Sequence, residues 1–215
     1  MATELVPGLW TWRREHPDWD LDSDYEPEVG SFAVRLEQAI LFVDPLWPEE
    51  ESEDFAWLDA LARADRLLVA VLKPDHARDA AGIAHAYGGR ILAGEASAAV
   101  LGPGAPVHVV QPGARLPDEV RVLDDARGRG ETPLWVPSHR AVLFADAVRG
   151  DPGGGLRVWS YPPGREDAVR AALRAIADLG PELVLVGHGR SVTSGGAAAL
   201  RAALDRPPWE RGERA

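Results

Sequence analysis

The sequence predicts an α+β fold in which helices cover the outer faces of mixed β-sheets, an αββα layering. Two observations lead to this class. Apolar segments joined by tight turns, the pattern of β-hairpins, occur in both halves of the 215-residue chain. Strand–helix units lie between the hairpins and near the end of the chain. Because no composition break marks a boundary, we expect a single domain at 1–205 and a C-terminal tail at 206–215.

In the first half, each predicted element has a local signal. A two-residue turn separates the strands at 30–36 and 39–43, and the second of these is wholly apolar. The segment at 49–64 begins with acidic residues, which suit the N-terminus of a helix. Pro74 ends the apolar run at 67–72, because proline has no N–H to donate to a neighbouring strand. The predicted elements are strands at 9–12, 30–36, 39–43 and 67–72 and helices at 49–64 and 80–87.

The second half repeats these patterns. A turn at 138–140 joins the strands at 133–137 and 141–144 into a second hairpin. The segment at 165–179 is amphipathic and rich in alanine and leucine, which predicts a helix. Residues 150–155 are glycine-rich and are expected to form a flexible loop. The predicted elements are strands at 90–93, 107–110, 119–123, 133–137, 141–144 and 182–186 and helices at 95–100, 165–179 and 194–205.

Composition and charge exclude several functions. The net charge of −11 argues against a broad nucleic-acid-binding surface, because phosphates would be repelled. No apolar run approaches the ~20 residues that span a bilayer, and the N-terminus has no signal-peptide pattern. The absence of cysteine excludes disulfides and thiolate metal ligands. We therefore expect a cytoplasmic protein that binds a small molecule and neither nucleic acid nor a membrane, and the oligomeric state stays open.

Ionisable side chains directly follow four of the predicted strands. The densest group lies at 75–79, where an acid, an imidazole, a guanidinium and another acid follow a buried strand. Sites in α/β proteins are commonly built at such strand ends. Carboxylates and imidazoles gathered there are typical of a divalent metal site. The candidate residues are Asp44, Asp75, His76, Arg78, Asp79, Asp146 and His188.

Taken in this order, the segments resemble the metallo-β-lactamase-fold superfamily, whose members are mostly metal-dependent hydrolases. The resemblance covers nearly the whole chain, from about 5 to about 204. Asp44 follows a strand similar to the one that ends in the family's supporting Asp, and 71–82 falls where the family carries His-x-His-x-Asp-His. Asp146 resembles the metal-bridging Asp, and His188 resembles the last His ligand. The resemblance implies a four-layer fold with two mixed sheets and outer helices.

The central motif departs from the family pattern. Pro74 stands at the first His and cannot ligate, whereas His76 keeps the second. Arg78, a cation, stands at the motif Asp, and Asp79 stands at the third His, where it can still ligate through oxygen. No histidine lies within 124–131, where the family's middle His is expected. The resemblance therefore implies a degenerate site, whose candidate metal ligands are His76, Asp79, Asp146 and His188, with Asp44 as support.

Three functions stay open for this site. One is a metal-free relative that binds a ligand, with Arg78 neutralising the clustered carboxylates in place of a metal. Another is a hydrolase of ester, thioester, lactone or phosphodiester bonds, with His76 and Asp146 as catalytic residues. It would hold one zinc, manganese or iron ion on Asp79, Asp146 and His188, and His76 would be a fourth ligand or a proton carrier. The third is an interaction protein in which these side chains are ordinary polar loop residues.

Two loops are candidates for contact with a substrate. Arg127 lies in the basic, glycine-rich loop at 124–131 and, with Arg78, is a candidate to bind an anionic substrate, although solvated charge is the commoner role of such a loop. The acidic loop at 13–28 contains Trp19 and follows Trp12, and its position suits a lid over the pocket.

Overall fold

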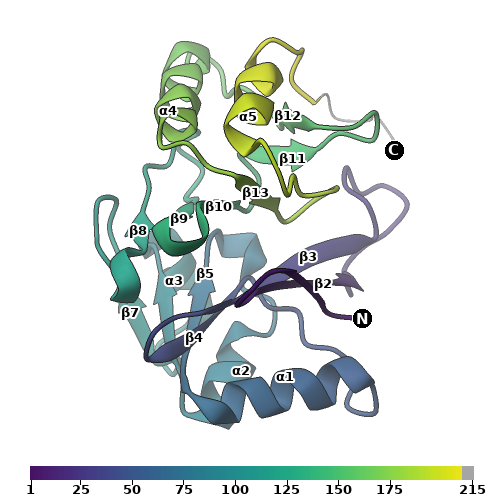
Figure 1. Ribbon diagram of the computed structural model, residues 1–215, viewed down its shortest axis with the longest axis vertical. Helices are drawn as coiled ribbons and strands as arrows, with labels where there is room; N and C mark the ends of the chain where they lie inside the picture. The colour runs from purple at the N-terminus through teal and green to yellow at the C-terminus, as the bar shows by residue number, and fades with distance from the viewer. Residues whose placement is uncertain (210–215) are drawn as a thin grey trace.

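The computed structural model describes residues 1–209 and places two β-sheets between two layers of helices (Figure 1). Helices α1 (Glu53–Ala64) and α2 (Ala80–Tyr87) lie on one outer side, and α4 (Glu166–Asp178) and α5 (Gly196–Leu204) lie on the opposite side. The layers follow the order helix, sheet, sheet, helix, which confirms the predicted fold class. No helix within these residues is long and apolar enough to cross a membrane.

The first sheet has seven strands and is mixed. In spatial order its strands are β1 (Thr3–Val6), β2 (Leu9–Glu15), β3 (Glu28–Arg35), β4 (Ala39–Val43), β5 (Arg66–Val71), β6 (Arg90–Ala93) and β7 (Val107–Val109). Strands β1 to β4 pair antiparallel, and β4 to β7 pair parallel. Parallel neighbours need a crossover, which α1, α2 and α3 (Glu95–Leu101) supply in turn.

The helices of this half begin and end at residues that satisfy their free backbone groups. The Ser52 side chain accepts a hydrogen bond from the N–H of Phe55 (3.1 Å) and caps α1. Gly88 ends α2 with a φ of 64°, a left-handed conformation that glycine adopts without strain. The 3₁₀ turn η1 (Pro74–His76) lies between β5 and α2 and directs the chain out of the sheet, so that His76 is buried.

The second half of the chain forms a four-stranded sheet and a separate hairpin. The four strands are β8 (Arg121–Val122), β9 (Leu134–Val136), β10 (Ala141–Phe144) and β13 (Leu183–Val186), and the hairpin is β11 (Val148–Gly150) with β12 (Leu156–Val158). Strands β10 and β13 pair parallel, whereas β8, β9 and β10 pair antiparallel. Short 3₁₀ turns, η2 (Pro117–Glu119) and η3 (Pro137–His139), precede β8 and β10.

Three apolar clusters fill the interfaces between the four layers. The cluster between the two sheets joins Leu41 of β4 to Leu143 of β10. A second cluster packs the second sheet against Leu173 of α4 and Leu200 of α5. The third packs the first sheet against α1 through Leu58. Burial of a leucine side chain contributes about 2 kcal/mol, so these clusters supply most of the driving force that holds the layers together.

The structure corrects several predicted element boundaries. Strand β2 continues beyond position 12 to Glu15. Helix α1 begins at Glu53 rather than at position 49, because Ser52 provides the cap. The predicted flexible loop at 150–155 is largely the turn of the β11–β12 hairpin, in which Gly154 and Gly155 have positive φ. The sequence analysis missed this hairpin because its glycine-rich turn was interpreted as a flexible loop.

The segment predicted as a tail from position 206 packs on the domain as far as the structure describes it. Trp209 is only 5% exposed, and its backbone N–H donates to the carbonyl of Val158 (2.8 Å). Arg206 forms an ion pair with Asp151 (2.8 Å). The fold therefore continues to Trp209, and the rest of the predicted tail, 210–215, lies outside the described residues.

Candidate metal and substrate site

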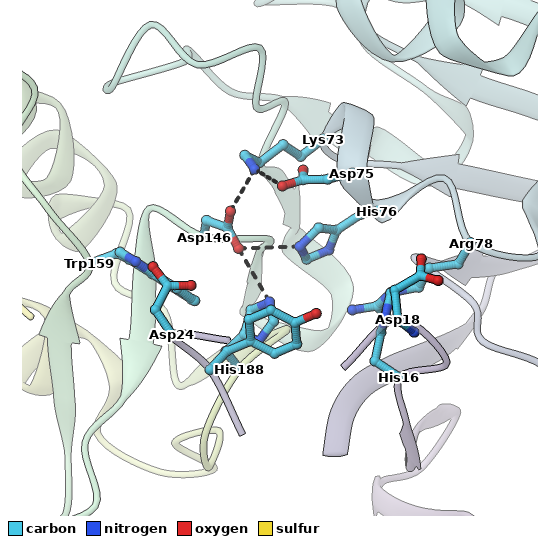
Figure 2. A pocket seen from close by; sticks show the side chains of 11 residues that line it. His16, Asp18, Asp24, Lys73, Asp75, His76, Arg78, Asp146, Trp159 and His188 are labelled. Carbon is cyan, nitrogen blue, oxygen red and sulfur yellow. Dashed lines mark hydrogen bonds and ion pairs between the residues drawn. The ribbon is translucent and has the colours of Figure 1, made fainter. Parts of the chain in front are cut away.

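The ends of four strands from both sheets meet at one edge of the molecule and carry the candidate residues. Asp44 follows β4, and the turn after β5 carries His76. Asp146 follows β10, and His188 follows β13. Strands β4 and β5 are parallel neighbours, as are β10 and β13, so each sheet presents two carboxyl ends side by side. The loops therefore converge on one cavity (Figure 2).

His76, Asp146 and His188 form the centre of the site. Their ligand atoms all lie within 4.8 Å of one another, and all three residues are buried. Oδ1 of Asp146 lies 3.2 Å from Nε2 of His76 and 3.4 Å from Nε2 of His188. The sequence analysis named all three, and the structure brings them together.

Asp44 stands behind His76. Its Oδ2 lies 2.7 Å from Nδ1 of His76, and its Oδ1 accepts a hydrogen bond from the N–H of Leu72 (2.8 Å). The carboxylate thus fixes the imidazole through its far nitrogen, the arrangement that orients metal-binding histidines. Burial alone would lower the pKa of His76, but Asp44 and Asp146 outweigh it and raise this pKa to about 9.

The other two members of the centre have opposite electrostatic surroundings. Burial alone would raise the pKa of Asp146, but His76, His188 and Lys73 hold it well below its usual value, so Asp146 is ionised. Burial holds the pKa of His188 well below its usual value although Asp146 raises it, so His188 is neutral. A neutral imidazole and an ionised carboxylate are both in the form that binds a metal.

Lys73 is a site residue that the sequence analysis missed. Its ammonium lies 2.7 Å from Oδ2 of Asp146 and also pairs with Asp75. Burial opposes its charge, but the two carboxylates raise its pKa, so Lys73 is protonated. A lysine at the end of a strand is ordinarily a solvated charge, which is why only the fold reveals this contact.

The structure does not bring Asp79 to the metal-binding centre. Its Oδ2 accepts a hydrogen bond from the backbone N–H of Trp47 (2.7 Å), and the residue precedes α2. Arg78 does line the cavity, but its Nη1 donates to the carbonyls of Gly30 (2.8 Å) and Asp44 (2.7 Å). The guanidinium therefore ties the ends of β3 and β4 together while it places a positive charge at the wall of the cavity.

Arg127 lies behind Asp146 rather than in the cavity. It is 7% exposed, and its Nη1 and Nη2 donate to the carbonyl of Asp146 (2.8 Å) and the hydroxyl of Ser160 (2.9 Å). The same loop carries Glu131, whose Oε1 accepts from the N–H groups of Ala145 (2.9 Å) and Asp146 (3.2 Å). Burial, reinforced by Asp146, raises the pKa of Glu131 to about 8. The sequence shows Glu131 only as one acid in a glycine-rich loop.

The cavity above the centre has a volume of about 480 Å³. The loop between β2 and β3 forms part of its wall, and its role as a lid stays a prediction. Tyr25 from this loop and Trp159 from beyond β12 each place a ring 4.9 Å from the His188 ring. The lining residues are His16, Asp18, Asp24, Tyr25, Lys73, Asp75, His76, Arg78, Asp146, Trp159 and His188.

A buried arginine anchors this loop. The Arg149 side chain is fully buried and forms an ion pair with Glu26. Its guanidinium carbon lies 3.8 Å from the centre of the Trp209 ring and 5.1 Å from that of Trp159. Cation–π contacts of this kind strengthen when they are desolvated. The C-terminal segment thus helps to hold the loop that carries Tyr25.

The donor set fits one divalent ion. In a tetrahedral site with bonds of about 2.0–2.1 Å, neighbouring ligand atoms lie about 3.3–3.4 Å apart. The separations of 3.2 and 3.4 Å between Asp146 and the two imidazoles match this value. Two imidazoles with one carboxylate suit zinc, manganese or iron. His76 must lose the proton on Nε2 before this nitrogen can bind such an ion. The positive charge of Lys73 opposes binding of the ion.

A four-layer arrangement of two mixed sheets between outer helices is the architecture of the metallo-β-lactamase fold. No protein-family model and no curated protein matches the chain. Solved structures do match. A metallo-beta-lactamase family protein from Thermus thermophilus has a TM-score of 0.65 and 16% identity, over 94% of this chain and 80% of that chain.

Two further structures agree with this assignment of the fold. A metallo-beta-lactamase from Erythrobacter litoralis has a TM-score of 0.66 and 15% identity, over 95% of this chain and 90% of that chain. A metallo-beta-lactamase from Pontibacter korlensis has a TM-score of 0.67 and 11% identity, over 96% of this chain and 99% of that chain. The resemblance noted in the sequence is confirmed at the level of the fold, and function has to be argued from the site.

Proposed function

We propose that the protein is a metal-dependent hydrolase with a single-ion site formed by His76, Asp146 and His188. The observation that carries this proposal is the gathering of three buried ligand atoms within 4.8 Å of one another, with Oδ1 of Asp146 at 3.2 and 3.4 Å from the two imidazoles, close to the edge of a tetrahedral site. Asp44 adds support, because it holds His76 through its far nitrogen, as carboxylates do in metal sites. Zinc is the first candidate, with manganese and iron as alternatives.

A bound divalent ion supplies Lewis-acid polarisation of a carbonyl or phosphoryl group and lowers the pKa of water. The protein's own residues bind and orient the substrate. Lys73 and Arg78 place positive charge at the cavity wall, where it stabilises negative charge that develops on the substrate. Tyr25 and Trp159 cover His188 with aromatic rings and limit the access of water. A small ester, thioester, lactone or phosphodiester suits a cavity of about 480 Å³.

A metal-free ligand-binding protein is the second candidate, and a specific observation favours it. The protonated Lys73 already lies 2.7 Å from Asp146, and His76 lies 3.2 Å from the same carboxylate. Side-chain cations can thus neutralise Asp146 without an ion. In this alternative the cavity binds a small molecule between Lys73, Arg78 and the aromatic rings, and no bond is hydrolysed.

Metal content separates the two candidates. Protein purified without chelator is analysed for metals, and the analysis is repeated after zinc, manganese or iron has been added. The single-ion site predicts about one equivalent of bound metal. His188→Ala should lose this ion, whereas His108→Ala, which changes an exposed histidine on β7, should retain it. The absence of bound metal under every condition would overturn the hydrolase proposal and favour the ligand-binding protein.

Activity is then screened on protein with its metal content measured. Chromogenic esters, thioesters, lactones and phosphodiesters cover the bonds that a single-ion hydrolase can cleave. The His188→Ala variant is the blank, because it lacks a ligand but keeps the other residues that line the cavity. Turnover in the wild type that is absent from this blank supports the proposal, and equal turnover in both proteins counts against it.

A further inference from the structure

We propose that Lys73 is a built-in cation that takes the place of a second divalent ion on Asp146 and limits the site to one metal. This inference rests on the function proposed above for the same site. It assigns a role to a residue that the motif comparison does not include, because Lys73 precedes Pro74, which stands at the first His of the motif. The role is electrostatic and does not require Lys73 to touch the substrate.

The two oxygens of Asp146 face different partners. Oδ1 faces the imidazoles of His76 and His188, at 3.2 and 3.4 Å. Oδ2 faces the ammonium of Lys73, at 2.7 Å (Figure 2). One carboxylate thus bridges two positions for positive charge. The first has imidazole ligands and fits a metal ion, and the second is already filled by a side chain.

The surroundings of Lys73 hold its ammonium in this second position. Its side chain is 14% exposed, and Asp75 also forms an ion pair with it. The carbonyl of Lys73 accepts a hydrogen bond from the N–H of His76, which fixes the backbone turn between them. Because the ammonium contacts the carboxylates of both Asp75 and Asp146, an ion held by these oxygens would have to displace Lys73.

A fixed positive charge beside a single-ion site has a measurable consequence. The ammonium repels a divalent ion at the imidazole side of the same carboxylate, and this repulsion is strong in a buried site. Removal of the charge should therefore tighten metal binding. If Lys73 were only a packing element, its replacement would leave metal binding unchanged or weaken it.

The test is calorimetric titration of zinc into metal-stripped wild type, Lys73→Met and Lys73→Arg. Methionine keeps the length of the side chain and removes its charge, and arginine keeps the charge. We expect the wild type to bind one equivalent, Lys73→Met to bind zinc about tenfold more tightly or better, and Lys73→Arg to bind within about threefold of the wild type. Unchanged or weaker binding by Lys73→Met would overturn the inference. Lys73→Gln provides a second neutral variant if Lys73→Met does not fold.

A second measurement keeps this inference separate from the proposed function. Denaturant unfolding of metal-stripped protein is compared for the wild type, Lys73→Met, Asp146→Asn and the double variant. If neither the wild type nor any variant binds zinc, the hydrolase proposal fails together with the limit to one metal, and this cycle decides whether Lys73 neutralises Asp146. A loss of stability on Lys73→Met that largely disappears in the Asp146→Asn background supports the built-in cation. Additive losses would show that Lys73 does not act on Asp146 and would overturn the inference.

Discussion

The two histidines of the site lie in contrasting surroundings. His76, beside the first sheet, has a carboxylate on each ring nitrogen, from Asp44 and Asp146. His188, beyond the second sheet, approaches Asp146 through Nε2, while its buried Nδ1 has no hydrogen-bond partner among the described residues. Aromatic rings of Tyr25 and Trp159 flank it instead. His76 is thus fixed by charge, and His188 is fixed by packing.

This difference between the two histidines indicates which substitutions should disturb each of them. A ligand fixed by a carboxylate depends on one residue behind it, whereas a ligand fixed by packing depends on the loop and hairpin around it. Asp146 contacts both histidines, because its Oδ1 faces the two imidazoles. Three variants follow from this comparison, in order of decreasing expected effect.

Asp146→Ala removes the carboxylate that contacts both His76 and His188. We expect zinc affinity to fall by about 10²-fold or more, because a ligand is lost. We also expect the free energy of unfolding of metal-stripped protein to fall by about 2 kcal/mol, because Lys73 and His76 each lose one of the two carboxylates that face them. Zinc titration and urea denaturation measure the two effects. Zinc binding at the wild-type affinity would show that the ion is held elsewhere.

Asp44→Asn sharpens the contrast between the two histidines. Asparagine fits the same space but has no charge with which to hold His76, so zinc affinity should fall by about 10- to 100-fold. His76 should also lose much of the raised pKa that Asp44 supports, which NMR titration of metal-stripped protein detects as a value below about 9. An unchanged His76 titration would mean that Asp146 alone governs this side of the site.

Asp79→Asn is expected to have the smallest effect. The carboxylate accepts from the N–H of Trp47, and an asparagine oxygen can accept the same hydrogen bond. Zinc affinity should stay within about twofold of the wild type, and the free energy of unfolding should change by less than about 1 kcal/mol. A large loss of zinc in this variant would restore Asp79 as the ligand that the motif comparison implies.

Much of the fold was predictable because its signals are local. Apolar runs, tight turns and the order of strands and helices determine the layering, and residues directly after parallel strands share one edge. Asp44, His76, Asp146 and His188 could therefore be named together. Their mutual distances depend on how the two sheets pack, which the sequence pattern does not contain.

The residues that sequence reasoning misplaced lie where the backbone turns between elements. The η1 turn, which begins at Pro74, is followed by Arg78 with a φ of 39°, and Asp79 faces Trp47 rather than the cavity. The same turn determines the direction of Lys73, which is the last residue before η1 and contacts Asp146. An alignment without gaps places residues along the chain but does not determine the direction of their side chains.

The stacking of Trp209 on Arg149 has a consequence for the length of any expressed fragment. A fragment that stops at position 205, where the predicted domain ends, would contain every strand and helix of the described fold. Its far-UV circular dichroism spectrum would look native. Arg149, which anchors the loop that carries Tyr25, would nevertheless have lost the Trp209 ring and kept only the Trp159 ring. Secondary structure is therefore an incomplete guide to where this domain ends, because the last aromatic side chain supports the wall of its cavity.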